Sequence, residues 1–414
     1  MSIRWTLLSS LSSKARSSHC AAVTSAGQLL FYSGELRPRV PVDGSLHVLD
    51  LEAASASVEK GSVAKSDSLW RVLSAVSASS SKLTQVPEPR VGASAVYDPQ
   101  GNNLYVWGGR GGVDMAPLDR YQSGIWKAHF GALGDADKLA WERLECANDD
   151  SVEAPALRSY HSSVLAGVRA SPASFGDRLI VQCSWCQGKL YIHAGCPASG
   201  RLAALHAYDL NTNKWQQCAD APAEPRGGTA IATVALPSSS SVKHEEVIIR
   251  FGGFAGYELP KVTDGATLPL DIYTPSNNTW ATIYPAADPD HRFPGPRSVH
   301  GLIPFSSPAS PGSHEVPVAL LYHGEGDASA LGHAGAGKFW DDAWLLLASP
   351  SSSPASADWK WKKLATAGTK PEGRGWFPST SYVTPEGKTR VVLTGGLLSS
   401  NARSEEVWVG DVQL

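Results

Sequence analysis

The 414-residue sequence has few of the features that mark helical, membrane-spanning or disulfide-rich proteins. It contains only 2 Met and 6 Cys, and no apolar run approaches the roughly 20 residues that a membrane helix needs. No segment repeats apolar residues at the spacing of an amphipathic helix. Six cysteines in so long a chain do not make a disulfide framework, so we expect free thiols and a cytoplasmic location.

The sequence also lacks an excess of either charge. Its formal net charge is −3, with 36 Lys and Arg against 39 Asp and Glu. This balance provides no basic surface, so we expect neither nucleic acid nor a membrane as a partner. Residues 1–18 are Ser-rich and basic, but their apolar stretch at 5–8 is too short for a signal peptide.

The abundant residues are those of turns and strands. The chain has 39 Gly, 28 Pro and 14 Trp, and its hydrophobic fraction of 42% is that of a folded protein. We therefore expect an all-β fold.

An arginine in polar or Pro/Gly-rich surroundings opens each of six segments of similar length. These arginines are Arg16, Arg90, Arg158, Arg226, Arg297 and Arg374, with gaps of 74, 68, 68, 71 and 77 residues. An apolar strand follows each one, and then a β-run that ends in a pair of mostly small residues. The pairs are Ser33-Gly34, Gly108-Gly109, Ala194-Gly195, Gly252-Gly253, His323-Gly324 and Gly395-Gly396.

Two further strands are expected in each segment. The third strands are predicted at 46–51, around Tyr121, and at 205–210, 270–275, 341–347 and 405–412. The fourth strands carry Trp70, Trp141, Trp215, Trp280, and either Trp359 or Trp361. The last segment has no such tryptophan, and Trp5 fits the vacancy. We therefore predict that strand 3–8 completes the last sheet.

Four-stranded sheets of this kind bury their faces by stacking around an axis. The Gly pairs and Trp positions resemble the kelch repeat, whose period is about 50 residues. The sequence thus predicts a single domain, 1–414, folded as an all-β, six-bladed kelch-type β-propeller. The blades are expected at about 16–72, 90–144, 158–218, 226–285, 297–364, and 374–412 plus 3–8. Surplus residues at 52–82, 167–177, 237–244, 306–316 and 349–357 are predicted to be solvated spacers.

The residues directly after the six pairs are candidates for a site at the mouth of the central channel. They are Glu35, Arg110, Cys196, Phe254, Glu325 and Leu397. The alternative is that each is a solvated turn residue. The Gly-rich stretch 324–340 adds Asp327 and His333, which with Glu325 suit proton transfer or binding of iron, zinc or manganese.

A second candidate metal site lies at Cys183 and Cys186, followed by His193 and Cys196. Successive side chains of a strand face opposite ways, so buried thiols are the alternative interpretation.

The motifs together resemble the plant specifier proteins, a kelch-propeller family that forms nitriles, epithionitriles and thiocyanates. The matching pieces are RSSH at 16–19, SGEL at 33–36, GGR at 108–110, RSYH at 158–161, RGG at 226–228, the stretch 324–337, and RGW at 374–376. The resemblance implies a pocket that steers an unstable aglucone with the help of Fe(II). Its pocket residues correspond to Glu35, Arg110 and Trp376. Its Glu-x3-Asp-x3-His iron triad corresponds to Glu325, Ser329 and His333, so the central aspartate is missing.

The chain has the pocket residues that the resemblance implies but lacks one of the three iron ligands. This combination favours an enzyme without a cofactor that acts on a reactive small molecule. Our specific expectation is a non-redox cyclisation or rearrangement of the hetero-Diels–Alder kind in secondary metabolism. Arg110, Glu35, Glu325 and His333 are predicted to be catalytic, and Trp376, Asp327, Phe254 and Arg374 to bind substrate.

Two alternatives stay open. The first is Fe(II)-assisted, specifier-like chemistry, with Glu325, Asp327 and His333 as iron ligands. The second is a non-catalytic kelch interaction module, although no BTB or F-box segment flanks the repeats. The protein is expected to be a monomer or a weak homodimer.

Overall fold

The computed structural model describes residues 1–60, 67–78, 85–130, 137–167, 188–236, 246–261, 267–306, 315–332, 335–351, 353 and 356–414. These residues are nearly all in strands and loops. The helices among them are α1 (Leu51–Glu59), α2 (Arg120–Ser123) and the 3₁₀ turns η1 (Ser12–Lys14) and η2 (Asp67–Leu69). None of the described helices is long and apolar enough to cross a membrane.

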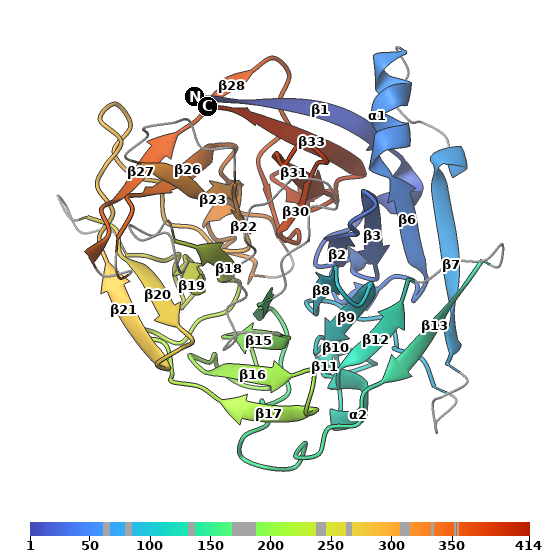
Figure 1. Ribbon diagram of the computed structural model, residues 1–414. Helices are drawn as coiled ribbons and strands as arrows, with labels where there is room; N and C mark the ends of the chain where they lie inside the picture. Colours follow the sequence, from blue (N-terminus) through green and yellow to red (C-terminus); the bar gives the residue numbers. More distant parts are fainter. Residues whose placement is uncertain are drawn as a thin grey trace.

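The segment behind each arginine, numbered 1 to 6 in chain order, folds as an antiparallel meander around a common centre (Figure 1). Segment 1 holds β2 (Cys20–Val23), β3 (Gln28–Tyr32), β6 (Leu46–Asp50) and β7 (Trp70–Ser77). Segment 2 holds β8 (Ser94–Asp98), β9 (Asn103–Trp107), β12 (Trp126–His129) and β13 (Lys138–Arg143). Segment 3 holds β14 (Ser162–Ala166), β15 (Lys189–His193), β16 (Leu205–Asp209) and β17 (Lys214–Gln217).

The remaining segments repeat this arrangement. Segment 4 holds β18 (Ala230–Ala235), β19 (Glu246–Phe251), β20 (Leu270–Thr274) and β21 (Thr279–Ile283). Segment 5 holds β22 (Gly301–Pro304), β23 (Val316–Tyr322), β26 (Ala343–Ala348) and β27 (Trp359–Lys363). Segment 6 holds β30 (Thr380–Val383), β31 (Thr389–Thr394) and β33 (Glu406–Gln413).

Strand β1 (Ser2–Ser10) completes the sheet of segment 6. It pairs antiparallel with β33, from Ser2 opposite Gln413 to Ser10 opposite Glu406, and carries β28 (Ala365–Ala367) in parallel on its outer edge. The two chain ends therefore lie side by side (Figure 1). Trp5 is buried in this sheet. The prediction that the N-terminal strand pairs with the last one is confirmed.

Short two-stranded ribbons lie between the second and third strands of several segments, and one joins the start of segment 6 to this region. They are β4 (Glu35–Arg37) with β5 (Val40–Pro41), β10 (Arg110–Gly111) with β11 (Ala116–Pro117), β24 (Glu325–Asp327) with β25 (Lys338–Phe339), and β29 (Arg374–Gly375) with β32 (Leu397–Leu398). Each ribbon starts within two residues of a predicted Gly pair or at an arginine that opens a segment.

Three details differ from the sequence-based expectation. The third strand of segment 2 is β12, whereas Tyr121 lies in α2, where Asp119 accepts the Gln122 N–H and starts the helix. The expected spacer 52–82 contains α1, which Asp50 caps through the Ala53 N–H. In addition, β7 and β13 pair in parallel, so segments 1 and 2 share one eight-stranded sheet. The expected spacers at 167–177, 237–244 and 306–316 lie almost wholly outside the described residues.

The tryptophans of the outer strands fill the space between neighbouring segments. Trp141 packs against Tyr32 of the preceding segment with ring centroids 5.6 Å apart, and Trp361 packs against Phe251 at 5.4 Å. Trp141 and Trp361 are both fully buried. Such aromatic contacts between adjacent sheets stabilise a circular stack in the way the sequence predicted.

Each arginine that opens a segment is buried and binds the backbone of its own segment. Its Nη1 donates to the carbonyl of the first residue of the pair, over 2.8–3.2 Å. The accepting residues are Ser33, Gly108, Ala194, Gly252, His323 and Gly395, in segment order. A charged donor of this kind satisfies a carbonyl that the strands leave unpaired. The repeated arginine is thus a structural clamp.

Backbone hydrogen bonds close a complete circle around the axis. In each segment, the second residue after the arginine donates its N–H to the carbonyl of the same position in the preceding segment, over 2.7–3.0 Å. The six members are Ser18, Gly92, Tyr160, Gly228, Val299 and Trp376, and all have positive φ. We call this set the axial circle. Ser18 accepts from Gly92 and donates to Trp376, so the first and last segments meet without a gap.

A second circle lies directly beside the first. The glycine that ends each pair donates its N–H to the carbonyl of the arginine in the next segment, over 2.8–3.0 Å. These glycines have φ between 96° and 109°, a conformation that other residues rarely adopt. A Cβ added to Gly324 would lie 2.4 Å from His300 Cβ. Close backbone approach is therefore the reason for a glycine here.

Candidate functional site

The axial circle separates two regions. On one side of the circle, the residue that follows each arginine forms a backbone bridge with the residue that follows the small-residue pair of the same segment. On the other side, the chain of each segment enters its innermost strand. The backbone bridges before the circle join Ser17 to Glu35, Val91 to Arg110, Ser159 to Cys196, Gly227 to Phe254, Ser298 to Glu325, and Gly375 to Leu397. We call the region of these bridges the rim. All six residues that the sequence placed at the channel mouth lie in the rim.

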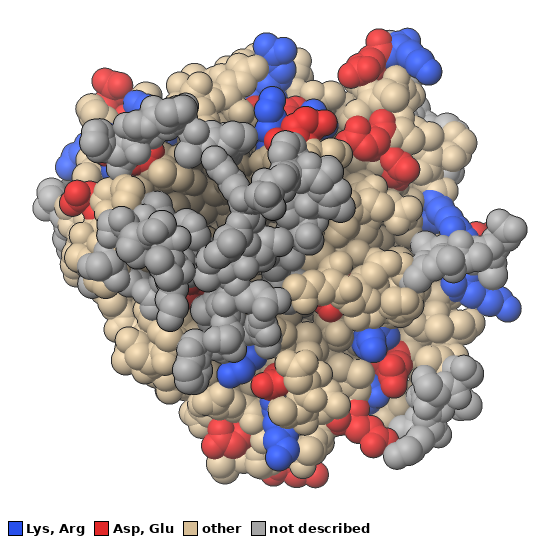
Figure 2. Space-filling model, in the orientation of Figure 1, with Lys and Arg blue, Asp and Glu red and all other residues tan. Residues whose placement is uncertain are grey.

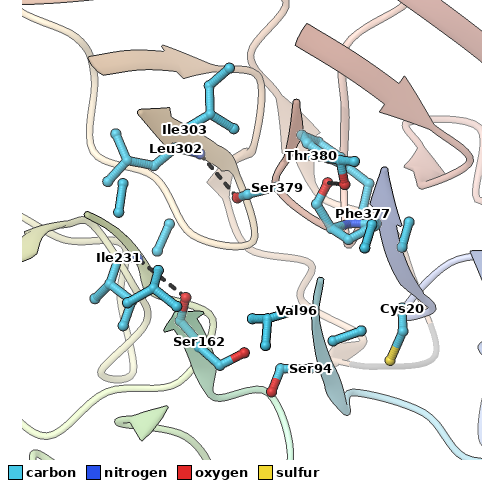
Figure 3. A pocket seen from close by; sticks show the side chains of 18 of the residues that line it. Cys20, Ser94, Val96, Ser162, Ile231, Leu302, Ile303, Phe377, Ser379 and Thr380 are labelled. Atoms are coloured by element: carbon cyan, nitrogen blue, oxygen red, sulfur yellow. Dashed lines mark hydrogen bonds between the residues drawn. The ribbon is translucent and has the colours of Figure 1, made fainter. Parts of the chain in front are cut away.

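Beyond the circle lies a channel of about 330 Å³, lined by the innermost strands of all segments. Figure 3 shows side chains of these strands pointing into it, among them Ser94, Ser162, Ile231 and Thr380. No Asp, Glu, Lys or Arg is among the described residues that line it. Many channel hydroxyls are already engaged: Ser162 Oγ accepts the Ile231 N–H at 3.2 Å. The channel is therefore an uncharged space.

The histidines beside the channel are also uncharged. Burial lowers the pKa of His161 to about 3, and the nearby Arg158 lowers it further. Burial likewise holds the pKa of His19 and His300 well below the usual value. His161 Nε2 lies 2.7 Å from Ser94 Oγ, a hydrogen bond between neighbouring segments.

The rim, by contrast, is charged, and it borders two aromatic residues of the axial circle, Tyr160 and Trp376, which also line the channel. Tyr160 and Trp376 meet edge to face with ring centroids 5.3 Å apart. The Arg110 guanidinium lies 5.5 Å from the centre of the Tyr160 ring, and its Nε donates to Ser159 Oγ at 2.7 Å. Those are the side-chain contacts of Arg110 within the described residues, and no carboxylate among them pairs with it. A cation on an aromatic surface is thus left without a counter-ion.

Glu325 lies close to the Trp376 side chain. It is 5% exposed, and its Oε1 accepts the Gly337 N–H at 3.1 Å. Burial raises the pKa of Glu325 to about 7, although the Gly337 N–H and the nearby Trp376 side chain partly oppose this rise. A carboxyl group in this range exchanges its proton readily at neutral pH.

Glu258 is a rim residue that the sequence analysis missed. It pairs through its backbone with Phe254 and is 9% exposed. Burial raises its pKa to about 8; the Ser298 hydroxyl lowers the pKa somewhat, and the carboxylates of Glu325 and Asp327 raise it. Neither carboxylate oxygen accepts a hydrogen bond of good geometry from the described residues. The available signal was an isolated acidic residue among apolar and glycine residues, five positions after a Gly pair.

Glu35, in contrast, has its own partners. It accepts the Arg39 N–H at 2.6 Å and lies 3.8 Å from the Arg403 guanidinium. The Ser18 hydroxyl lies 3.5 Å from it. Burial raises the pKa of Glu35, and these donors oppose the rise. Phe254, across the rim, lies under the Arg201 guanidinium at 4.8 Å.

Other predicted site residues lie elsewhere. Arg374, predicted to bind substrate, is fully buried and donates to Gly395 O, Ser404 Oγ and Glu406 Oε2, so its placement is structural. His333 lies outside the described residues, as do Cys183 and Cys186 of the second candidate metal site. Of that site, His193 is fully buried beside Arg250.

The donors expected for iron are not brought together in the described part of the chain. Glu325 is buried, whereas the Asp327 side chain is 67% exposed and lies 3.5 Å from Lys338 Nζ. Ser329 Oγ accepts the Leu331 N–H. The cluster of metal-ligating side chains found among the described residues is Asp288, Asp290 and His291. There Lys362 already neutralises Asp288 at 3.0 Å, so that cluster is a capped turn.

On the face of the molecule seen in Figure 2, the charged side chains of the described residues are of both signs. Figure 2 shows Lys and Arg interspersed with Asp and Glu around the periphery of the face in view. This distribution agrees with the near-neutral composition.

Comparison with known proteins supports the propeller class. No protein-family model matches the chain. The solved structure of YjhT, a kelch-type propeller protein, matches with a TM-score of 0.54 over 95% of this chain and 94% of that chain. The sequence identity is 13%, so this likeness concerns the fold alone. The chain is thus an all-β protein of propeller-like fold over nearly its whole length.

Proposed function

We propose that this chain is a six-bladed propeller enzyme that acts on a small molecule at the rim. The axial circle supports the blade count, because six hydrogen bonds lead from Ser18 around to Ser18 again. The same circle supports the site, because it gathers groups from five segments far apart in the sequence, namely Arg110, Tyr160, Glu258, Glu325 and Trp376. One observation carries the proposal: Arg110 and Glu258 are ionisable groups of the rim without partners of opposite charge among the described residues.

The proposed chemistry is a non-redox cyclisation or rearrangement, and a hetero-Diels–Alder reaction is the specific form we favour. Arg110 would hydrogen-bond an oxygen that gains negative charge in the transition state. Glu325 would lend a proton to the substrate and take it back, so that no co-reactant is consumed. Tyr160 and Trp376 would hold a flat substrate against their faces, which supplies orientation. The product is then either an isomer of the substrate or an adduct of two bound reactants.

Specifier-like chemistry with Fe(II) is a weaker candidate. It requires Glu325 and Asp327 to share an ion, yet the first is buried against Gly337 and the second is exposed beside Lys338. No feature of the described residues favours this alternative over the proton-transfer site.

A product-ratio assay tests the proposal. The chelator-treated protein is incubated with an ortho-quinone methide, generated in place, and an enol ether. We expect a product ratio different from that of the buffer reaction, and Glu325→Gln should abolish the difference. Asp137→Asn, which removes an exposed carboxylate paired with Arg71 beside the outer strands, is the matched control and should leave the ratio unchanged. An unchanged ratio with the wild-type protein would rule out the cycloaddition, and an effect of Asp327→Asn would instead favour a metal.

A further inference from the structure

A chain of contacts that includes two aromatic side chains connects Arg110 to the buried carboxyl groups of the rim. Arg110 contacts the Tyr160 ring at 5.5 Å, and the Tyr160 ring contacts Trp376 at 5.3 Å. Trp376 in turn is close enough to Glu325 to influence its ionisation. Glu258 lies near Glu325, since the Ser298 hydroxyl lies beside Glu258 and the Ser298 backbone pairs with Glu325. The rim thus has a positive and an acidic pole.

Neither pole has a group of opposite charge paired with it among the described residues. At the acidic pole two buried carboxyl groups lie near enough for Glu325 to raise the pKa of Glu258, and burial is the main cause of the raised pKa of both. At the positive pole, Arg110 is bound by a hydroxyl and an aromatic ring instead of a carboxylate. The contrast within the rim is Glu35, which already has Arg403 at 3.8 Å. A buried charged group usually has a partner, so these poles lack something that a ligand can supply.

We propose that the ligand of the rim is a zwitterion, with an anionic group at Arg110, a protonated amine at Glu258 and Glu325, and a flat body against Tyr160 and Trp376. This inference rests on the site of the proposed function and adds the class of its substrate. Bidentate Arg–carboxylate pairing suits the first pole. An organic ammonium suits the second, because Trp376 beside it offers an aromatic face. A bare divalent cation fits less well, since no third ligating group lies within 4.8 Å among the described residues.

The proton balance follows from this arrangement. When an ammonium group approaches, the ionised form of Glu258 is favoured, and the proton that Glu258 holds near neutral pH leaves to solvent, whereas Glu325 keeps the proton that the proposed reaction uses. Binding of a cationic or zwitterionic ligand should therefore release protons, whereas binding of an anion alone should not.

Calorimetry with a matched probe set tests the proposal. The probes are 4-(aminomethyl)benzoate and 4-(aminomethyl)phenylacetate as zwitterions of two lengths, 4-methylbenzoate as anion, and 4-methylbenzylamine as cation. We expect one zwitterion to bind the full chain about tenfold or more tightly than either single-charge probe. Titration in buffers of different ionisation enthalpy should show proton release with the zwitterion and the amine.

Variants assign the poles. Glu258→Gln should weaken the zwitterion and the amine about tenfold and leave 4-methylbenzoate unchanged. Arg110→Gln should weaken the zwitterion and 4-methylbenzoate about tenfold and leave 4-methylbenzylamine unchanged. Asp137→Asn, which removes an exposed carboxylate paired with Arg71, serves as control and should change none. Circular dichroism confirms that each variant is folded. Equal affinity for anion and zwitterion, or zwitterion binding unaffected by Glu258→Gln, would overturn the proposal. If that happens while Glu325→Gln still abolishes the product-ratio effect, the proposed function stands and only the ligand class is wrong.

Discussion

The contacts between neighbouring segments are of two kinds that alternate around the axis. Segments 1, 3 and 5 begin with Arg-Ser-x-His, at 16–19, 158–161 and 297–300, and each follows a segment whose pair is Gly-Gly. There the histidine ring occupies the place of a Cβ: His161 Cε1 would lie 2.7 Å from a Cβ on Gly108. The same holds for His300 with Gly252 and for His19 with Gly395. We call these contacts the Gly–His seams.

The other three seams have the opposite arrangement. The first residue of the pair carries a side chain, namely Ser33, Ala194 or His323, and the position facing it in the next segment is Ala93, Thr229 or Phe377 instead of histidine. At one of these seams His323 and Phe377 meet edge to face at 6.2 Å. The Gly–His contact is thus confined to three of the six seams, and these alternate with the other kind around the axis.

The unpaired groups of the rim lie on the Gly–His seams. The serine of Arg-Ser-x-His reaches back to the preceding segment: Ser159 binds Arg110, and Ser298 lies beside Glu258. One residue departs from the alternation. Trp376 occupies the position held by Gly92 and Gly228 in the other even segments, with φ 61°. A tryptophan in this left-handed conformation costs about 1–2 kcal/mol, and strain of this kind persists where function requires the side chain.

The largest expected effect comes from breaking a Gly–His seam. A Cβ on Gly252 would lie 2.3 Å from Arg297 O and 2.6 Å from His300 Cε1. Gly252→Ala should therefore lower the free energy of unfolding by about 4 kcal/mol or more, measured by urea denaturation. Ala194→Gly, at the same position of the other kind of seam, should change the free energy of unfolding by less than about 1 kcal/mol, because relief of the left-handed conformation of Ala194, φ 61°, offsets the loss of one buried methyl group. Equal losses in the two variants would contradict the alternation.

A smaller effect is expected from the acidic pole of a Gly–His seam. The folded-state pKa of Glu258 is raised to about 8 by burial, above its ordinary value, so the folded form favours the protonated group. Its contribution to stability is present at low pH and is lost as the pH rises through about 8. Each tenfold difference in proton affinity between the folded and unfolded chains corresponds to about 1.4 kcal/mol. Glu258→Gln should accordingly raise the free energy of unfolding at pH 9 by about 2 kcal/mol or more, with little effect at pH 4.

Glu406→Gln provides the control of opposite sign. Burial raises the pKa of Glu406, but hydrogen bonds from Trp408 and Arg374 outweigh it and hold the pKa below the usual value. This substitution should destabilise the protein at pH 7, and the loss should shrink as the pH falls below the usual glutamate range. Parallel pH profiles for the two variants would refute the assignment of Glu258.

The smallest effect on stability is expected when Trp376 is replaced by glycine, the residue that segments 2 and 4 have at this position. In Trp376→Gly, relief of the left-handed strain should offset the lost contact with Tyr160, leaving the free energy of unfolding within about 1 kcal/mol of wild type. Binding of 4-(aminomethyl)benzoate should nevertheless fall about tenfold. Phe377→Ala, one residue on and buried in the core, should instead cost about 3–5 kcal/mol without a specific binding loss. A large stability loss in Trp376→Gly would indicate a structural role.

Much of the fold could be predicted because it depends on short-range patterns. The apolar strands, the glycine that ends each pair and the pairing of residues 3–8 with the last strand follow from residue types at regular intervals. The alternation was hidden because its period is two segments and the loops between are uneven. Arg374 was misassigned for a related reason: one arginine per segment marks the repeat, and its buried hydrogen bonds to Gly395 and Glu406 are visible only in three dimensions.

The candidate site was predictable in part. The six residues after the pairs do lie together, because the backbone bridges of the rim are set by the same repeat. Glu258 was missed because its position depends on a hairpin that returns to Phe254, and hairpins of unequal length give no fixed spacing. Glu35 has a partner of opposite charge in Arg403, whereas Arg110 has none among the described residues. This difference depends on contacts between segments, and no local motif of the sequence encodes it.

The pairing of β1 with β33 has a consequence for how the molecule is made. Strand β1 has its main partner at residues 406–413, about 400 residues later in the chain. At roughly 5–20 residues per second, synthesis of the residues between them takes about 20–80 s, during which the strand containing Trp5 has no sheet to join. The last sheet therefore forms only when synthesis of the propeller is almost finished.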